Sequence, residues 1–191
     1  MKISDRFDLN DRVLAKVSDR RPNLIGRYSV SKIWAINNGY LTEEQYIKGE
    51  EFSVKSALRM TKGTMKHTYI EELLDGYKTE TKKEMKLEHF TIVGVADVLD
   101  LFGKDVCDYK TSDELKQAKR WDEYQVRIYC TMFERPVGYI LQPRQDDNNL
   151  WLEIIGKVKR NDKWFDTQMA KLLTFHNNLI KNYGNSTNNL P

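Results

Sequence analysis

Hydrophobic and polar residues along the centre of the chain predict two strands joined by a turn. Residues 92–99 are rich in apolar, β-branched side chains, which strands favour, and a short turn leads to a return strand over 106–110. Charged residues interrupt this apolar pattern. Asp97 falls within the first strand, and Asp108 and Lys110 lie two apart on the second, where they share one face.

This charged hairpin has two interpretations. Carboxylates on neighbouring strands can hold a hard divalent cation such as Mg²⁺ or Mn²⁺, and a lysine beside them can orient water or neutralise charge on a phosphate. The alternative is a solvated face with a cross-strand Asp–Lys pair, worth under about 1 kcal/mol. The hairpin by itself leaves both open.

Apolar residues at helical spacing, preceded by capping residues, predict helices around the hairpin. The expected helices cover residues 32–36, a segment opening at 42–45, and residues 53–60, 64–74, 111–134 and 163–183. Gly63 is expected to break the chain between two of them. The helix after Gly63 carries an apolar stripe of Met65, Tyr69, Ile70, Leu73 and Leu74.

The remaining segments predict further strands. Residues 77–91 are expected to form strands with an exposed basic loop, and 137–141 and 150–158 to form strands around a polar loop over 143–149. The four tryptophans are interpreted as core residues rather than base-stacking platforms: Trp34, Trp121, Trp151 and Trp164. Together these elements predict a layered α/β (α+β) fold.

Composition narrows the class of protein. The 191 residues suit a single domain over 1–191, with a polar segment 1–28, a core 29–183 and a disordered tail 184–191. With 40% hydrophobic and 31% charged residues and no apolar run near the ~20 residues of a membrane span, we expect a soluble, cytoplasmic protein without a membrane partner. The net charge of +3 is weak evidence for a polyanionic partner. The two cysteines, Cys107 and Cys130, are interpreted as buried structural thiols rather than a redox pair.

Four motifs follow one another along the chain: Gly63-x-x-x-His67, Gly94-x-x-Asp97, Asp108-Tyr109-Lys110-Thr111-Ser112 and Gln125-x-x-x-Tyr129. In their order and in the elements expected to carry them, they resemble the RecB-type branch of the PD-(D/E)XK nuclease superfamily. That superfamily also includes CRISPR-adaptation nucleases and, more distantly, lambda-type exonucleases. The resemblance covers about residues 29–129. It implies a restriction-endonuclease-like core with a central mixed β-sheet flanked by helices and with extra N-terminal helices.

The resemblance also implies roles for individual residues. The metal ligands would be His67, Asp97, Asp108 and the backbone carbonyl of Tyr109. Lys110 would be the catalytic lysine, and Gln125 and Tyr129 would line the cleft and position that lysine or a DNA phosphate. Glu71, four residues after His67, is a candidate extra acid.

The chemistry of these residue types agrees with such a site. One or two Mg²⁺ or Mn²⁺ ions, about 3.5–4 Å apart if both bind, can activate water and neutralise charge on a phosphodiester. His67 would bind as a neutral imidazole, so activity should fall at acid pH. Many members of this branch carry an iron–sulfur cluster on one early and three late cysteines. We expect no cluster here, because no cysteine precedes His67 and none follows Cys130.

We therefore expect a Mg²⁺- or Mn²⁺-dependent deoxyribonuclease, with an exonuclease on linear DNA ends favoured by analogy with the family. The alternatives are a structure- or site-specific endonuclease and a non-catalytic nucleic-acid-binding module with the nuclease fold. The small size of the chain is similar to that of viral, plasmid or phage exonucleases. Several properties stay open: duplex or single-stranded DNA as substrate, a monomer or a homo-oligomer, and a role in recombination or genome processing. Basic residues that flank the proposed site are candidates for DNA binding: Lys78, Lys82, Lys83, Lys86, Lys116, Lys119 and Arg120.

Overall fold

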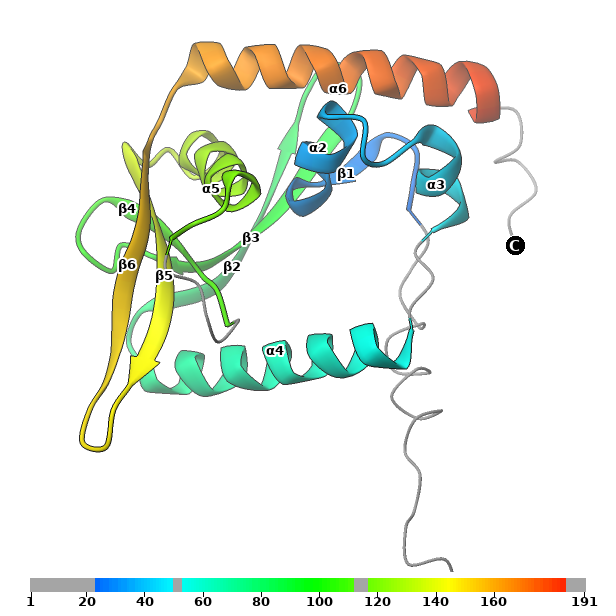
Figure 1. Cartoon of the computed structure of the whole chain (residues 1–191). Coiled ribbons are helices and arrows are strands. Elements are labelled where there is room, and N and C mark those ends of the chain that lie inside the picture. The colour runs from blue at the N-terminus through cyan, green and yellow to red at the C-terminus, as the bar shows by residue number, and fades with distance from the viewer. Residues whose placement is uncertain (1–22, 50–52, 112–116, 185–191) are drawn as a thin grey trace, which may run out of the picture.

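The structure, a computed structural model, describes residues 23–49, 53–111 and 117–184, which form six strands and five helices (Figure 1). In chain order these are β1 (Arg27–Ser29), α2 (Val30–Asn37), α3 (Glu43–Lys48), α4 (Val54–Leu73), β2 (Lys78–Lys86), β3 (Thr91–Leu99), β4 (Asp105–Tyr109), α5 (Arg120–Met132), β5 (Val137–Gln145), β6 (Leu150–Lys159) and α6 (Asp162–Tyr183). The polar segment up to residue 22, residues 112–116 and the tail from 185 lie outside the described residues. Ser112 of the third motif, Lys116 of the proposed DNA-binding residues and most of the expected disordered tail therefore lie outside the described residues.

The strands form one mixed sheet, as predicted, with β3 at its centre. Along its whole length β3 pairs antiparallel with β2. On its other side it pairs parallel with β1 at its start and antiparallel with β4 at its end. Strand β4 then runs parallel to β5, and β5 runs antiparallel to β6. The ends of β3 and β4 are thereby placed in the interior of the sheet.

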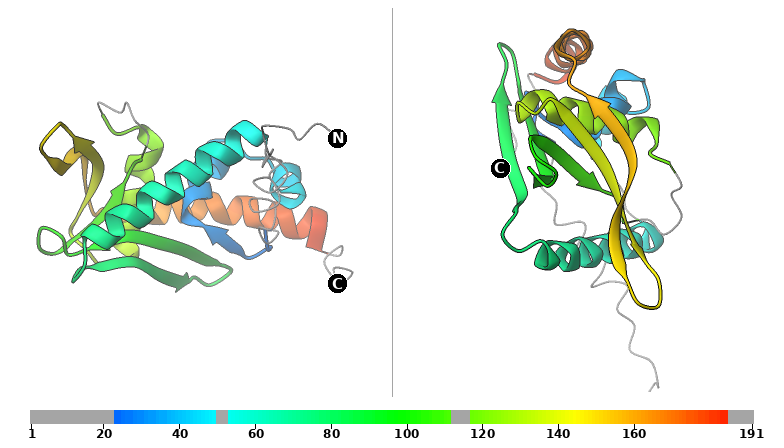
Figure 2. Two further views of the ribbon diagram at one scale, coloured as in Figure 1. Left: turned by 90° about the horizontal axis from the view of Figure 1, so that it is seen from below. Right: turned by 90° about the vertical axis from the view of Figure 1, so that its left-hand side faces the viewer.

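Helices cover the sheet on both sides, and two hydrophobic clusters result (Figures 1 and 2). The larger cluster joins the sheet to α2, α5 and α6, with Ile33, Ile128 and Leu172 fully buried. The smaller one packs Ile70 of α4 against residues of β3, β4 and β5 that include Tyr109. Because both faces of β4 are covered, all of its residues are buried, including the charged Asp108.

Gly63 does not break the helix as expected, since α4 runs continuously from Val54 to Leu73. A Cβ at Gly63 would lie 3.4 Å from the Thr111 side-chain oxygen, so the chain after β4 passes within van der Waals contact of α4 at this glycine. The apolar stripe of α4 is also mostly outside the core. Ile70 is buried, whereas Met65 is 68% exposed and Tyr69 is 55% exposed.

Two strand predictions also need correction. Within the segment 77–91, where strands with a basic loop were expected, residues 78–86 form one continuous strand, because β2 pairs with β3 from end to end. Strand β5 continues through Pro143 to Gln145, where a loop was expected. Proline is tolerated at position 143 because the pairing of β5 with β4 ends at Leu141. Beyond Leu141, in the described residues, β5 is paired with β6 on one side.

Burial of the aromatic and sulfur residues matches the predictions only in part. Cys107 and Cys130 are buried free thiols, as expected. Two of the tryptophans are not core residues, since Trp121 and Trp151 are each 45% exposed. No described helix is both long and apolar enough to span a membrane.

Candidate active site

The four sequence motifs converge where β3 and β4 meet α4 and α5. His67 comes from α4, Asp97 from β3, and Asp108 and Lys110 from β4 and the residue that follows it. His67 Nδ1 lies 3.9 Å from Asp97 Oδ1, and Lys110 Nζ lies 2.5 Å from Asp108 Oδ2. Segments far apart in the sequence therefore assemble one polar site between buried elements.

Lys110 lies between two buried carboxylates. Besides Asp108, its Nζ atom is 3.3 Å from Asp122 Oδ1 in the first turn of α5. Burial lowers the pKa of Lys110, but the carboxylates of Asp108 and Asp122 outweigh burial and hold that pKa above its usual range. Lys110 is consequently a fixed positive charge at neutral pH and is unsuited to act as a proton acceptor.

Asp97 is only 6% exposed, and its Oδ2 atom accepts the backbone N–H of Tyr109 at 2.7 Å. Burial and the nearby Asp108 carboxylate raise the pKa of Asp97 well above its usual value, although the Tyr109 N–H opposes the shift. Two buried carboxylates that repel each other are a fitting environment for a cation, because a cation would remove both the repulsion and the desolvation cost.

His67 supplies the one nitrogen donor of this group. Its ring packs against the Tyr109 ring with 4.6 Å between centroids, and its side chain is 29% exposed. Burial lowers the pKa of His67 in spite of the nearby Asp108 and Glu71 carboxylates. The imidazole is therefore neutral at pH 7, which is the form that binds a metal.

Two glutamates extend the site beyond the strand carboxylates. His67, Glu71 and Glu80 each offer a ligand atom, and these atoms all lie within 4.8 Å of one another. Glu71 also accepts the Tyr109 hydroxyl at 3.4 Å. Partial desolvation and the Glu71 carboxylate raise the pKa of Glu80 to about 7, although Glu80 is exposed as a whole.

Glu80 was not among the site residues predicted from the sequence. This residue stands across from Asp97, because the β2–β3 register pairs Thr79 with Val98 and Thr81 with Ala96. Its backbone has a φ of 44°, which is rare for a residue other than glycine. A strand predicted over the whole of 78–86 and paired with β3 would have placed Glu80 near Asp97.

Asp122 was also missed. It is 3% exposed, and its Oδ2 atom accepts the backbone N–H of Lys119 at 3.1 Å, while the other oxygen faces Lys110. It precedes Gln125 and Tyr129 by three and seven residues, which places all three on one face of α5. That spacing was the available signal.

Gln125 contacts Asp108, whereas the resemblance implied that it positions Lys110 or a DNA phosphate. Its Nε2 atom donates to Asp108 Oδ1 at 3.1 Å and lies 3.0 Å from the Tyr129 hydroxyl oxygen. The amide thus orients the carboxylate instead of Lys110. Tyr129 is buried, and burial raises its pKa, so its hydroxyl stays protonated at neutral pH.

Gly94 explains why a glycine precedes Asp97 in the second motif. A Cβ built on Gly94 would lie 2.6 Å from Cε1 of the Tyr129 ring and 3.2 Å from Val30 Cγ2. Both neighbours are buried, so neither can move aside without disturbing the core. The close packing of α5 on β3 therefore requires glycine at this position.

We predict that Gly94→Ala lowers the free energy of unfolding by about 1–3 kcal/mol through this overpacking. It should also reduce cleavage activity, because Tyr129 and Gln125 would shift. Urea denaturation of the variant and the wild type measures the first effect. Gly63→Ala is the matched control, since its Cβ would make an ordinary contact with Thr111 and alanine favours helix. Equal loss of stability in both variants would contradict the prediction.

The basic residues proposed for DNA binding are spread over two regions. On β2, Lys82 pairs with Glu84 at 3.2 Å and Lys83 with Glu134 at 3.6 Å. Lys78 and Lys86 end the same strand and are exposed. At the start of α5, Lys119 and Arg120 are exposed, and Lys119 lines a cavity that also includes Lys110.

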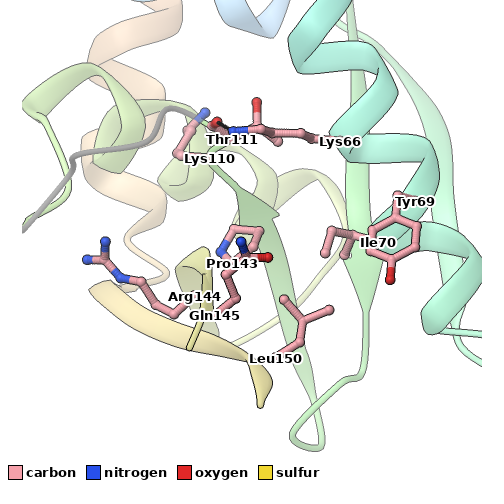
Figure 3. A pocket seen from close by; sticks show the side chains of 9 residues that line it. All are labelled: Lys66, Tyr69, Ile70, Lys110, Thr111, Pro143, Arg144, Gln145 and Leu150. Carbon is pink, nitrogen blue, oxygen red and sulfur yellow. Dashed lines mark hydrogen bonds between the residues drawn. The ribbon is translucent and has the colours of Figure 1, made fainter. Parts of the chain in front are cut away.

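A further cavity, of about 390 Å³, is also lined by Lys110 (Figure 3). Its walls come from α4, the end of β4, β5 and β6, and they include Ile70, Pro143 and Leu150. The Lys66 ammonium donates to the backbone carbonyl of Thr111 at 3.2 Å, and this bond ties α4 to the end of β4 between the two cavities.

No protein-family model and no curated protein matches the chain in sequence. Solved structures match its fold. The alkaline exonuclease LHK-Exo from Laribacter hongkongensis is similar over 93% of this chain and 96% of its own, with a TM-score of 0.59 and 12% identity. Its complex with dAMP matches over 81% and 88%, with a TM-score of 0.55 and 14% identity.

Two other solved structures agree. SSO0001 is similar over 87% of this chain and 82% of its own, with a TM-score of 0.60 and 16% identity. A phage-related exonuclease from Haemophilus somnus 129PT matches over 81% and 95%, with a TM-score of 0.50 and 15% identity. The chain thus shares the fold of these solved structures, which is the mixed α/β fold that the sequence predicted.

Proposed function

We propose that this protein is a divalent-metal-dependent deoxyribonuclease that hydrolyses phosphodiester bonds from the ends of linear DNA. The observation that carries the proposal is the convergence of His67, Asp97, Asp108 and Lys110, from separate elements, in one buried polar site. Similarity in fold to proteins described as exonucleases, one of them in complex with dAMP, supports the choice of DNA ends as substrate.

The proposed cofactor is Mg²⁺ or Mn²⁺. Carboxylate oxygens with a single imidazole suit these hard cations. Burial keeps His67 neutral, and Asp97 lies close enough to Asp108 for the Asp108 charge to raise the pKa of Asp97. His67, Asp97 and Asp108 would hold the ion, with the Tyr109 carbonyl as a further ligand and Glu71 and Glu80 close by. When bound, such an ion supplies Lewis acidity and an activated water.

The protein's own side chains would then position the reacting groups. Lys110 carries a permanent charge that can stabilise negative charge developing on a phosphate, and the poor screening inside the site strengthens this effect. Asp122 keeps Lys110 in place, and Gln125 keeps Asp108 oriented.

One DNA at two topologies tests the proposal. With Mg²⁺ or Mn²⁺, we expect the protein to degrade an end-labelled linear duplex to mononucleotides or short oligonucleotides and to leave the closed circle intact. Asp108→Ala is the inactive control. Nicking of the circle would establish an endonuclease instead. Retarded migration of DNA without cleavage of either form would favour the non-catalytic binding module.

A further inference from the structure

The cavity that Lys119 and Lys110 both line has a volume of about 810 Å³ and opens between α4 and the start of α5. We call it the basic cleft, because five of the described side chains that line it are basic and one is acidic. The basic residues are Arg59, Lys62, Lys66, Lys110 and Lys119. The acid among these described residues, Asp122, is already engaged with Lys110, so the described lining carries net positive charge.

One wall of the basic cleft is a row of cations along α4. Arg59, Lys62 and Lys66 are separated by three and four residues, which places them on one face of the helix about one turn apart. All three residues are exposed. A row of this kind suits a chain of phosphates, since each cation can meet a successive negative charge.

The opposite wall carries the ring of Trp121, and the rings of Trp34 and Tyr40 continue from it beyond the described lining of the cleft. Trp121 is 45% exposed, and its ring lies 5.7 Å from that of Trp34, which in turn stacks on Tyr40 at 4.9 Å with an interplanar angle of 13°. Tyr40 is 69% exposed, and Lys119 Nζ lies 4.9 Å above the Trp121 ring. Exposed aromatic rings next to cations are the surface on which unpaired bases stack.

These features select among nucleic-acid partners. Bases within a duplex already stack on one another, so an aromatic wall adds binding energy only for an unpaired base. We infer that the basic cleft binds a single DNA strand, with its phosphates along α4 and a base on Trp121, and delivers it to Lys110. This inference rests on the proposed function and names the form of DNA that reaches the site.

The test is fluorescence anisotropy with a labelled oligothymidine of about 12 nucleotides and a blunt hairpin duplex of equal charge, in EDTA to prevent cleavage. Trp121→Ala should weaken single-strand binding by roughly tenfold and duplex binding by less than about twofold. Trp121→Phe should keep most of the affinity. Trp151→Ala is the matched control, because Trp151 is also 45% exposed but lines a different cavity.

Two double variants test the row of cations on α4. Both replace exposed residues, so the core stays intact. Arg59→Ala/Lys62→Ala should reduce the slope of log affinity against log salt by roughly one to two. The control, Lys163→Ala/Lys171→Ala on α6, should leave that slope unchanged. Equal effects of the test and control variants, or equal losses for single strand and duplex, would overturn the inference. Tighter binding of the matching oligouridine RNA would overturn the assignment to DNA.

Cleavage measured separately with Mn²⁺ distinguishes this inference from the proposed function. Cleavage together with single-strand binding that is unaffected by Trp121→Ala would reject the basic cleft as the strand site and leave the nuclease in place. Binding that depends on Trp121 without cleavage by any divalent metal would reject the nuclease and keep the single-strand site.

Discussion

Lys110→Ala is expected to slow DNA cleavage by at least about 10²–10³-fold, the effect typical of removing one group that stabilises charge in the transition state. Lys110 is the cation held between Asp108 and Asp122. The single substitution also leaves two buried carboxylates without their counter-ion, so it should destabilise the protein as well.

A double variant separates these two effects. Lys110→Ala/Asp122→Asn removes one of the orphaned carboxylates and should recover much of the lost stability without recovering cleavage. Cleavage of linear DNA and urea denaturation are measured on both variants. Lys104→Ala, on the exposed turn between β3 and β4, is the control that should behave as the wild type. Recovery of cleavage in the double variant would mean that Lys110 serves the fold and not the reaction.

Asp97→Asn is expected to change metal-free and metal-bound stability in opposite directions. Burial and Asp108 raise the pKa of Asp97 above its unfolded value, so the ionised carboxylate destabilises the folded state as pH rises through that pKa. Asparagine removes the charge and can still accept the Tyr109 N–H. In EDTA at neutral pH the variant should therefore be at least as stable as the wild type.

Bound Mn²⁺ should reverse the order of stability of the wild type and Asp97→Asn. Mn²⁺ at about 100 times its dissociation constant should stabilise the wild type by about 2.7 kcal/mol, which raises Tm by roughly 5–10 °C. Asp97→Asn should lose most of that increase. Thermal denaturation with EDTA or Mn²⁺ measures both effects, and Asp105→Asn is the control. Asp105 is equally buried, but it accepts backbone N–H groups of residues 101 and 102, so its replacement should lower Tm and keep the response to Mn²⁺. The metal site would be wrong if Asp97→Asn and Asp105→Asn responded alike.

The sequence predicted those features that depend on local pattern. The hairpin over residues 92–110 shows apolar, β-branched runs and a turn within a short window, and the order of the motifs was enough to identify the fold. The same pattern placed Asp108 and Lys110 on one face, where the structure brings them into contact.

The missed features depend on partners that are distant in sequence. Gly63 resembles a helix breaker until Thr111 is known to lie against it. Glu80 enters the site only through the register of β2 on β3, and no local pattern encodes that register. Trp121 was assigned to the core because of its side-chain type, yet its exposure is set by how α5 sits beside α2.

The sparse packing of α4 divides the site into two parts of unequal local stability. Of its twenty residues only Ala57 and Ile70 are buried, whereas β4 is buried throughout. Amide hydrogens of α4 should therefore exchange through local opening at a lower free-energy cost than those of the sheet. When α4 opens, His67 and the cations of the helix leave together, while Asp97, Asp108 and Lys110 stay assembled on the strands. Binding of metal and DNA at the proposed site should thus be coupled to the order–disorder equilibrium of a single helix.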